Sequence, residues 1–269
     1  MTAQPHGVSF AGLHHRPGEP LLLPNAWDHA SAAALAARGF PAIATSSLAV
    51  AAAVGLPDGA GVTREHTQRL AASLGAGPYF LSVDAEGGFS DDPQDVAELV
   101  RELWRAGAVG VNLEDGLGPA GRHAAKIAAV KAAVPGMFVN ARTDTHWSGD
   151  GDETDTLRRL DAYQQAGADG VFVPGLTDPE RITALVRRLE VPLNILYSTA
   201  GPTVPQLADL GVARVSLGSL PYRRALGAAL DAVADIAGGR TPVGTTPSYD
   251  EVCTLARGVP ASGPANSAG

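Results

Sequence analysis

Short apolar runs alternate with longer amphipathic, alanine-rich stretches along almost the whole chain. The runs have the length and the bulky residues of buried strands, and the longer stretches have the spacing of helices that bury one face. The expected strands contain LLLPN, FPAIATS, YFLSVD, GVNLE, MFVNAR, GVFVP, PLNIL and RVSLG. The expected helices cover about residues 28–38, 63–74, 93–106, 122–133, 154–166, 178–189, 205–210 and 221–237.

The ends of the expected helices carry matching start and stop signals. SDDPQD and TDPE place Asp and Pro at a helix start, and ARGF, RAGAVG, QAGADG and DLGVAR place glycine after the last turn. One junction occurs twice in similar form, as AGAVGVNLED at 106–115 and AGADGVFVPG at 166–175. Eight strand–helix units in succession predict a (β/α)8 TIM barrel over residues 21–239, with a doubly wound open sheet as the alternative.

The two ends of the chain fall outside this repeating pattern. We expect residues 1–20 to be a loosely attached N-terminal extension, with His14 and His15 at the surface. Residues 240–269 are expected to form a separate C-terminal segment that ends in the tail GVPASGPANSAG. The small and polar residues of that tail are typical of disorder.

Polar side chains interrupt the apolar pattern on three successive strands. They are Ser82, Asp84, Glu86, Asn112, Glu114, Asn140 and Arg142. Because side chains two residues apart share a face of a strand, and the apolar faces must meet the helices, these groups are predicted to line the barrel interior. Such groups are costly there unless they form an internal polar network or serve a site at the barrel mouth, and we expect a site.

Three of these groups are carboxylates on neighbouring strand ends, Asp84, Glu86 and Glu114. Like charges about 4 Å apart repel by roughly 4 kcal/mol even at an effective dielectric constant of 20, so either one carboxyl is protonated or a cation lies among them. Oxygen ligands without Cys or His favour a hard ion, and we predict Mg²⁺, with Mn²⁺ as the alternative. Arg142 is suited to a substrate carboxylate or phosphate.

The composition narrows the possible partners and the cellular setting. The net charge of −8 and the absence of a basic stripe argue against nucleic acid, and no apolar run is long enough to span a bilayer. The single cysteine, Cys253, excludes an internal disulfide and fits a reducing compartment. The first residues lack the basic and apolar regions of a signal peptide, so we expect a cytoplasmic protein.

Four segments together resemble the isocitrate lyase/phosphoenolpyruvate mutase superfamily. They are PNAWDHASAAALAARGFPAIATSSLAVAAAVGLPDG, VDAEGGF, NLEDG and NARTD, and the likeness runs from about Leu21 to Ala237. The resemblance implies an (α/β)8 barrel, dependence on Mg²⁺, and cleavage or formation of a C–C or P–C bond beside an enolate. It also implies a homo-oligomer, a dimer or tetramer, in which the last helix packs on a neighbouring subunit, and the segment after Gly239 is a candidate for that contact.

The resemblance also implies roles for the acidic residues. Asp84 matches the metal-binding aspartate of the superfamily, and Glu86 lies where many members have a second aspartate that holds the ion through water. Glu114 matches the acidic residue of the next strand. Asp58, in GLPDG, matches an aspartate near the water shell of the metal.

A second group of residues is implied to bind the substrate. Arg142 matches the arginine that holds the substrate carboxylate, and Ser46, with the backbone N–H groups of Ser47 and Leu48, matches the loop that cradles the same group.

Asp144, two residues after Arg142, is interpreted as orienting that arginine or capping a helix. Asn194, in PLN, points another polar group to the end of the barrel, either to contact substrate or to make structural hydrogen bonds.

The loop after the fourth expected strand departs from the superfamily pattern. The lyases proper carry a catalytic cysteine there on a Lys-Cys-Gly-His-type loop, whereas residues 116–123 read GLGPAGRH. This difference argues against authentic isocitrate or methylisocitrate lyase activity. His123 at the end of the loop, Asp58 and a metal-bound water are the candidate proton donors.

These observations predict a Mg²⁺-dependent lyase that cleaves a C–C bond of a small 2-hydroxy or 2-oxo di- or tricarboxylic acid through a pyruvate-type enolate. P–C bond chemistry, of the phosphonopyruvate hydrolase or phosphoenolpyruvate mutase kind, is the second hypothesis. The third is a non-catalytic protein that binds a metal–dicarboxylate complex.

Overall fold

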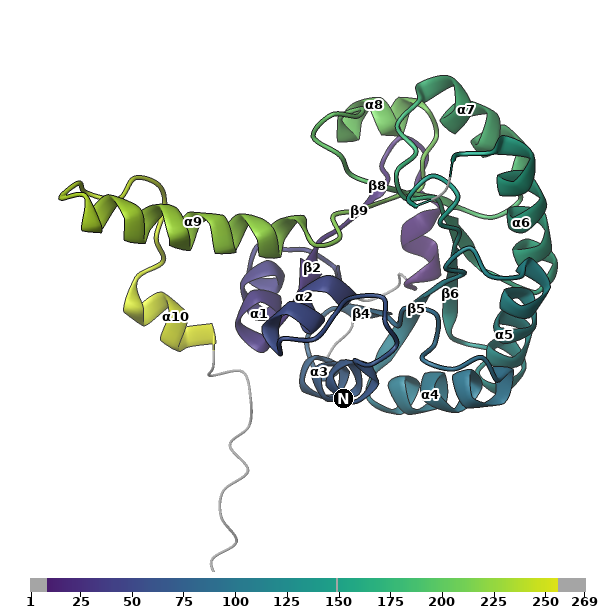
Figure 1. Ribbon diagram of the computed structural model, residues 1–269, viewed down its shortest axis with the longest axis horizontal. Helices are drawn as coiled ribbons and strands as arrows, with labels where there is room; N and C mark the ends of the chain where they lie inside the picture. The colour runs from purple at the N-terminus through teal and green to yellow at the C-terminus, as the bar shows by residue number, and fades with distance from the viewer. Residues whose placement is uncertain (1–8, 149, 256–269) are drawn as a thin grey trace, which may run out of the picture.

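Nine parallel strand segments form one sheet at the centre of the molecule, and helices surround it (Figure 1). The computed structural model describes residues 9–148 and 150–255. The order of the segments across the sheet is β1-β9-β8-β7-β6-β5-β4-β3-β2. Their bounds are β1 Leu21–Leu23, β2 Asn25–Ala26, β3 Ala42–Thr45, β4 Phe80–Asp84, β5 Ala108–Glu114, β6 Phe138–Arg142, β7 Gly170–Phe172, β8 Leu193–Leu196 and β9 Arg214–Ser216.

The first two segments are the halves of one strand that is interrupted at Pro24. Proline has no backbone N–H to donate to a neighbouring strand, but the carbonyl oxygen of Pro24 accepts a hydrogen bond from Ala44 N–H at 2.8 Å. Because β1 pairs with β9 and β2 pairs with β3, this strand joins the two ends of the sheet. The nine segments therefore make an eight-stranded barrel, which confirms the (β/α)8 prediction and shows that the open-sheet alternative is wrong.

The helices follow the strands in the expected alternation. Their bounds are α1 His29–Ala37, α2 Ser47–Ala53, α3 Arg64–Leu74, α4 Pro93–Arg105, α5 Ala120–Ala133, α6 Glu153–Gln165, α7 Pro179–Arg188, α8 Val204–Asp209, α9 Leu220–Ala237 and α10 Tyr249–Leu255. The sequence pattern predicts all of these except α2 and α10. The expected start signals are confirmed at α4 and α7, where Asp92 and Asp178 cap the first turn ahead of a proline.

The apolar faces of the strands meet the helices, as side-chain alternation predicts. Val83, Val111 and Val139 are buried in one core cluster together with residues of the surrounding helices, including Leu99 of α4 and Ile127 of α5. The opposite, polar faces of β4, β5 and β6 consequently point into the barrel. Burial of the apolar faces fixes the register of each strand and so fixes which side chains can reach a site inside the barrel.

A smaller apolar cluster lies at the N-terminal ends of the strands. The 3₁₀ turn η1, Ala11–His14, lies inside the ring of strands and is drawn in purple in Figure 1. Phe10 packs against Phe80 and Phe138, and the ring of His14 stacks on Phe138 with a centroid distance of 4.3 Å. The expectation that His14 lies at the surface is wrong, because these aromatic residues draw it into the barrel, where it is 4% exposed.

The last two described helices leave the barrel (Figure 1). None of the α9 residues is buried, and Leu226, Leu230, Val233 and Ile236 are 50–66% exposed. Helix α10 turns back to α1, where the His29 ring donates a hydrogen bond to the carbonyl of Leu255 at 3.2 Å. Within the described ranges, no helix combines the length and the apolar character needed to cross a membrane.

Candidate active site

A small cavity of about 90 Å³ lies at the C-terminal ends of the strands. Six of the predicted site residues line it, namely Ser46, Ser47, Leu48, Asp58, Asp84 and Arg142. A larger hollow of about 530 Å³ lies near the start of α7 and at α8, but none of the predicted residues lines it. The chemistry of the lining residues, rather than the size of the hollow, therefore selects the candidate site.

Asp84, the last residue of β4, is held by the segment that follows β3. The backbone N–H of Ser47 donates to Asp84 Oδ2 at 3.2 Å, and the backbone N–H of Asp84 donates to Thr45 Oγ1 at 2.9 Å. The short helix α2 begins at Ser47, directly at this contact. Asp84 and the Ser46–Leu48 segment are thus brought together as predicted.

Glu86 lies in a turn after β4 rather than on the strand. The strand ends at Asp84, and Glu86 adopts a left-handed backbone conformation with φ of 48°. Its buried carboxylate accepts hydrogen bonds from Thr63 Oγ1 at 2.5 Å and from Gly61 N–H at 3.0 Å. Burial raises the pKa of Glu86, these hydrogen bonds oppose the rise, and the charges of Asp84 and Asp58 add to it.

Glu114 and Arg142 form an ion pair at the ends of β5 and β6. Arg142 Nη1 forms an ion pair with Glu114 Oε2 at 2.8 Å, and Arg142 Nε donates a hydrogen bond to Asp144 Oδ1 at 2.6 Å. The interpretation of Asp144 as an orienting residue for Arg142 is confirmed. Burial raises the pKa of Glu114 to about 8 despite the attraction of Arg142, and the charges of Asp84, Asp144 and Glu86 raise it further.

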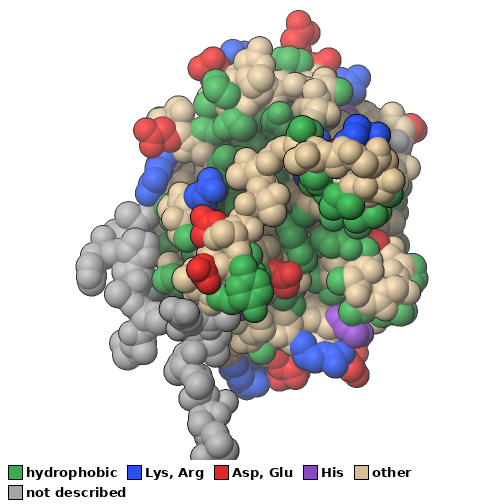
Figure 2. Space-filling view, turned by 90° about the vertical axis from the view of Figure 1, so that its left-hand side faces the viewer, with side chains coloured by type: hydrophobic (Ala, Val, Ile, Leu, Met, Phe, Trp, Pro, Cys, Tyr) green, Lys and Arg blue, Asp and Glu red, His purple; other side chains and the backbone are tan. Residues whose placement is uncertain are grey.

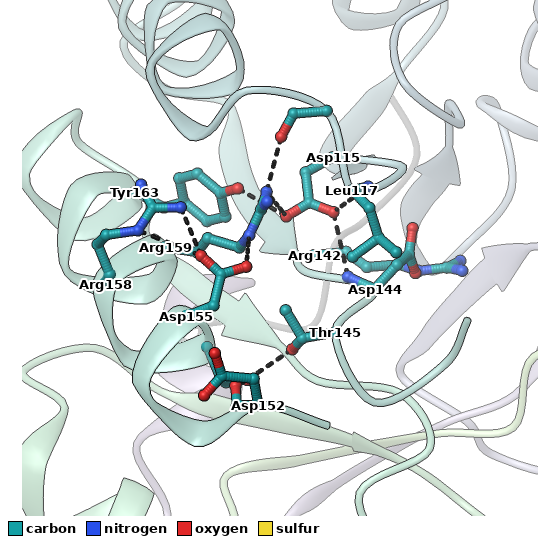
Figure 3. A network of polar contacts seen from close by, with 12 residues as sticks. Asp115, Leu117, Arg142, Asp144, Thr145, Asp152, Asp155, Arg158, Arg159 and Tyr163 are labelled. Carbon is teal, nitrogen blue, oxygen red and sulfur yellow. Dashed lines mark hydrogen bonds and ion pairs between the residues drawn. The ribbon is translucent and has the colours of Figure 1, made fainter. Parts of the chain in front are cut away.

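Asp115, which sequence reasoning did not single out, anchors a second polar network (Figure 3). Its Oδ2 accepts hydrogen bonds from Tyr163 at 2.7 Å and from Arg159 Nη1 at 3.1 Å. Its Oδ1 accepts hydrogen bonds from the backbone N–H groups of Leu117 at 3.0 Å and Asp144 at 3.1 Å. Asp115 therefore ties the loop after β6 to the turn after β5, and its position beside Glu114 in NLEDG is its only signal in the sequence.

Four predicted site residues, Glu86, Glu114, His123 and Asn194, are not among the residues that line the cavity. His123 is buried in α5 against the edge of Tyr163, with a centroid distance of 4.6 Å, and burial lowers its pKa to about 4. Asn194 is buried in the barrel, where its Nδ2 donates to Ser216 Oγ at 3.0 Å. Structural hydrogen bonding is thus the arrangement found for Asn194.

The acidic residues around the cavity suit a hard cation by their chemistry. Among residues 9–148 and 150–255, no three His, Cys, Asp or Glu side chains are grouped closely enough to form a ready-made metal site. Burial and neighbouring carboxylates nevertheless raise the pKa values of Asp58, Glu86 and Glu114. A divalent cation beside oxygen ligands would relieve this repulsion, so the donor set fits Mg²⁺.

Residues 10–237 match the model of the phosphoenolpyruvate phosphomutase family. The chain belongs to this family. The superfamily expected from the sequence is thereby confirmed, and the matched residues include the whole barrel.

The relatives of this chain include proteins that are named for several different activities. An uncharacterised protein of Mycobacterium tuberculosis (strain H37Rv) is 45% identical over 86% of this chain and 90% of its own length. The 2-methylisocitrate lyase of Bacillus subtilis is 32% identical over 70% of this chain and 66% of its own length. The oxaloacetate decarboxylase of Ectopseudomonas mendocina is 30% identical over 72% of this chain and 71% of its own length.

Solved structures in the superfamily share the fold. A putative lyase/mutase from Burkholderia cenocepacia has a TM-score of 0.81 and 36% identity, over 92% of this chain and 93% of its own. A phosphonopyruvate hydrolase in complex with oxalate and Mg²⁺ has a TM-score of 0.78 and 25% identity, over 90% of this chain and 91% of its own. Named relatives therefore include both lyases and enzymes of P–C chemistry.

Proposed function

We propose that this protein is a Mg²⁺-dependent lyase that cleaves a C–C bond of a small 2-hydroxy or 2-oxo di- or tricarboxylic acid. The observation that carries the proposal is one small cavity in which Asp84 faces Arg142 and the Ser46–Leu48 segment. A carboxylate cluster beside a guanidinium suits a ligand that is bound through a metal ion and through its own carboxylate. The names of the lyase and decarboxylase relatives support the same reaction class.

Arg142 is the proposed anchor for the substrate carboxylate. Glu114 pairs with Nη1 of Arg142, and Asp144 accepts a hydrogen bond from its Nε. Nη2 of Arg142 donates to none of the described side chains. The remaining donor is thus available to a ligand in the cavity. Ser46 and the backbone of Ser47 and Leu48 lie on the cavity wall, where they would fix the other oxygen of the carboxylate.

Asp84, Glu86 and Glu114 are the proposed ligands of Mg²⁺, with Mn²⁺ as the alternative, directly or through water. When bound, the ion would polarise the 2-oxygen of the substrate and balance the charge of the enolate. Asp58 is the favoured proton carrier of this chain, because it lines the cavity and burial raises its pKa. His123, the other side chain considered, is buried behind the barrel wall.

P–C chemistry ranks second because the cavity offers few positive groups for a phosphonate. Arg122 and Lys126, on α5 after the loop that follows β5, both lie within 4 Å of Asp91 instead of lining the cavity. Release of phosphate from phosphonopyruvate would reverse this order. Tight binding of Mg²⁺ and oxalate without turnover of any candidate acid would favour a non-catalytic binding protein.

The experiment is a substrate screen on the purified full chain with Mg²⁺. Oxaloacetate, substituted malates and citrate-like acids would be tested for release of pyruvate or glyoxylate, and phosphonopyruvate for release of phosphate. We expect a C–C substrate to be cleaved, EDTA to abolish turnover, and Mg²⁺ to raise Tm in the wild type but not in Asp84→Asn. Asp91→Asn, at an exposed position, is the control. No cleavage of any acid by the Mg²⁺-bound protein would contradict the proposal.

We also propose that the protein is a homo-oligomer in which α9 packs on a second copy of the chain. The apolar residues on α9 have no cover within the described part of the chain, and Figure 2 shows hydrophobic side chains on the side from which α9 projects. Leu230→Glu together with Val233→Glu is expected to lower the molar mass measured by light scattering. Asp231→Lys, on the same helix, controls for a change of charge, and an unchanged mass in the double variant would contradict the proposal.

A further inference from the structure

A guanidinium lies inside the barrel and has no carboxylate partner in the part of the chain that the structure describes. Arg214, at the start of β9, is 1% exposed and forms no ion pair with any described side chain. Its Nη2 donates to Asn112 Oδ1 at 3.1 Å, and its Nε donates to Ser216 Oγ at 3.2 Å. Its Nη1 is buried and has no hydrogen-bond partner among residues 9–148 and 150–255. A buried and unpaired charge is costly, so its position calls for a functional reason.

The charge of Asp84 acts on Arg214, but no described carboxylate forms an ion pair with it. Burial lowers its pKa to about 9, and the negative charge of Asp84 opposes that fall, so the guanidinium stays a cation at neutral pH. His14, on the other side, is kept neutral because burial, together with Arg214 itself, lowers its pKa to about 3. Arg214 therefore places a positive charge inside the barrel, whereas Asp84 and Glu114 are acidic residues at the ends of β4 and β5.

Arg214 also determines how the amide of Asn112 is oriented. A guanidinium only donates hydrogen bonds, so the Asn112 atom that faces Nη2 must be the oxygen Oδ1. Asn140 Nδ2 donates to the same oxygen at 2.8 Å. Asn112 lines the cavity, and its Nδ2 makes no hydrogen bond to a described residue. The amide N–H groups of Asn112 are thus left for a ligand.

The place of Asn112 in the sheet puts this donor beside the proposed metal ligands. In the sheet register Asn112 lies between Asp84 of β4 and Asn140 of β6. Glu114, two residues further along β5, shares its face and lies nearer the barrel mouth. The donor therefore lies level with Asp84 and two residues below Glu114 on the same face of β5.

We propose that Asn112 donates a hydrogen bond to an anionic oxygen of the bound acid, and that Arg214 is the positioning residue that fixes this donor. The proposal rests on the proposed function and deepens it, because it assigns one oxygen of the substrate to the barrel floor. The cavity would then hold its ligand between a metal at the rim and a donor below. Ligands with a carboxylate or carbonyl oxygen at this place would be selected over ligands that present an amine or amide N–H there.

The test uses Asn112→Asp, a change that keeps the size of the side chain. One carboxylate oxygen still accepts from Arg214 and Asn140, but the N–H donor at the cavity becomes an acceptor. With Mg²⁺ present, we expect calorimetry to show oxalate affinity falling by about 10- to 100-fold. Oxamate, which can present an N–H donor to the new carboxylate, should lose less affinity. Ser219→Asp, elsewhere on the cavity wall, controls for added charge.

The role of Arg214 is tested by two further variants. The new side chain in Arg214→Gln carries both a donor and an acceptor, so it no longer fixes which way the amide of Asn112 faces. The affinity for oxalate should therefore fall as it does in Asn112→Asp. Arg214→Lys, which still only donates, should restore part of the affinity. A purely structural role would lower Tm in both variants without changing the ratio of oxalate to oxamate affinity. If either variant of Arg214 fails to fold, the other still tests the role of Arg214, and Asn112→Asp tests the donor itself.

The outcomes separate this inference from the proposed function. Suppose that the wild type binds oxalate and that Asn112→Asp leaves the ratio of oxalate to oxamate affinity unchanged. This result would overturn the inference but not the proposed function. A changed ratio without cleavage of any candidate acid would uphold the inference and overturn the lyase. No oxalate binding by the Mg²⁺-bound wild type would overturn both.

Discussion

Arg142 reaches the cavity already oriented by its neighbours. Glu114 forms an ion pair with it, and Asp144 accepts a hydrogen bond from its Nε. The rings of Trp147 and Phe172 each lie with their centroid 5.9 Å from its Cζ atom. The planar guanidinium of an arginine can pair with two carboxylates and still offer a donor to a ligand. The ammonium of a lysine is a single compact charge and does not reach several partners in fixed directions. The shape of the residue therefore matters here as much as its charge.

We expect Arg142→Lys to lower kcat/KM by about 100-fold or more on the substrate found by the screen, because the substrate carboxylate loses its fixed donor. Steady-state kinetics and calorimetry with oxalate measure the loss. Arg122→Lys, at an exposed ion pair with Asp91, is the matched control and should leave both unchanged. Wild-type values for Arg142→Lys would show that Arg142 does not hold the substrate.

Side-chain alternation is sufficient to predict Asp84 and Arg142 at one site, because the period of two holds for as long as the strand continues. It fails at Glu86, since β4 ends at Asp84 and the left-handed turn redirects the next carboxylate to Thr63. The role of Asn112 is also hidden, because its partner Arg214 is 102 residues away in the chain. A local pattern carries no information on such pairings.

At the scale of elements, Asp115 joins the turn after β5, the loop after β6 and helix α6. Its side chain is fully buried, and its hydrogen bonds to Arg159 and Tyr163 reach two residues one turn apart on α6. Its hydrogen bond from Asp144 N–H extends this support to the residue that orients Arg142. The loops beside the cavity are thus positioned by a network outside it.

Asp115→Asn is expected to lower the free energy of unfolding by about 3 kcal/mol, because it leaves the buried guanidinium of Arg159 without its full counter-charge. Tyr163→Phe removes one hydrogen bond and should cost about 1 kcal/mol. Urea unfolding measures both. Equal costs for the two variants would show that the charge of Asp115 is not what stabilises these loops.

Elements with a clear periodicity are the ones that the sequence predicts well. Helices α4 and α7 combine an apolar stripe with an Asp-Pro start, so local chemistry and packing agree. Helix α2, with the sequence SLAVAAA, has no polar face to mark it. Helix α10 lies beyond the eighth unit of the repeat, and only its contact with α1 shows where it packs.

At the scale of the whole molecule, two buried histidines couple stability to pH. Burial lowers the pKa of His14 to about 3 and that of His123 to about 4. Unfolded chains take up protons on histidine near pH 6.5. Below that pH the unfolded state therefore binds more protons than the folded state, and stability falls as the pH falls towards the folded pKa values.

His14→Phe is expected to reduce this acid sensitivity. Relative to pH 7.5, the wild type should lose about 2 kcal/mol more than the variant at pH 5, because only the wild type can protonate this ring on unfolding. Urea midpoints at the two pH values measure the difference. His15→Phe, at the exposed neighbouring position, should behave like the wild type. A parallel pH response of His14→Phe and the wild type would show that His14 does not contribute.

The strand divided at Pro24 also has a consequence for biosynthesis. Leu21 pairs with Arg214 and Leu23 with Ser216, so the seam joins residues from opposite ends of the barrel sequence. During translation the emerging chain must wait for β9 before the ring can close, and until then both margins of the sheet stay unpaired. A ribosome that stops before Arg214 would release a chain prone to aggregation, and chaperones would be needed most in that interval.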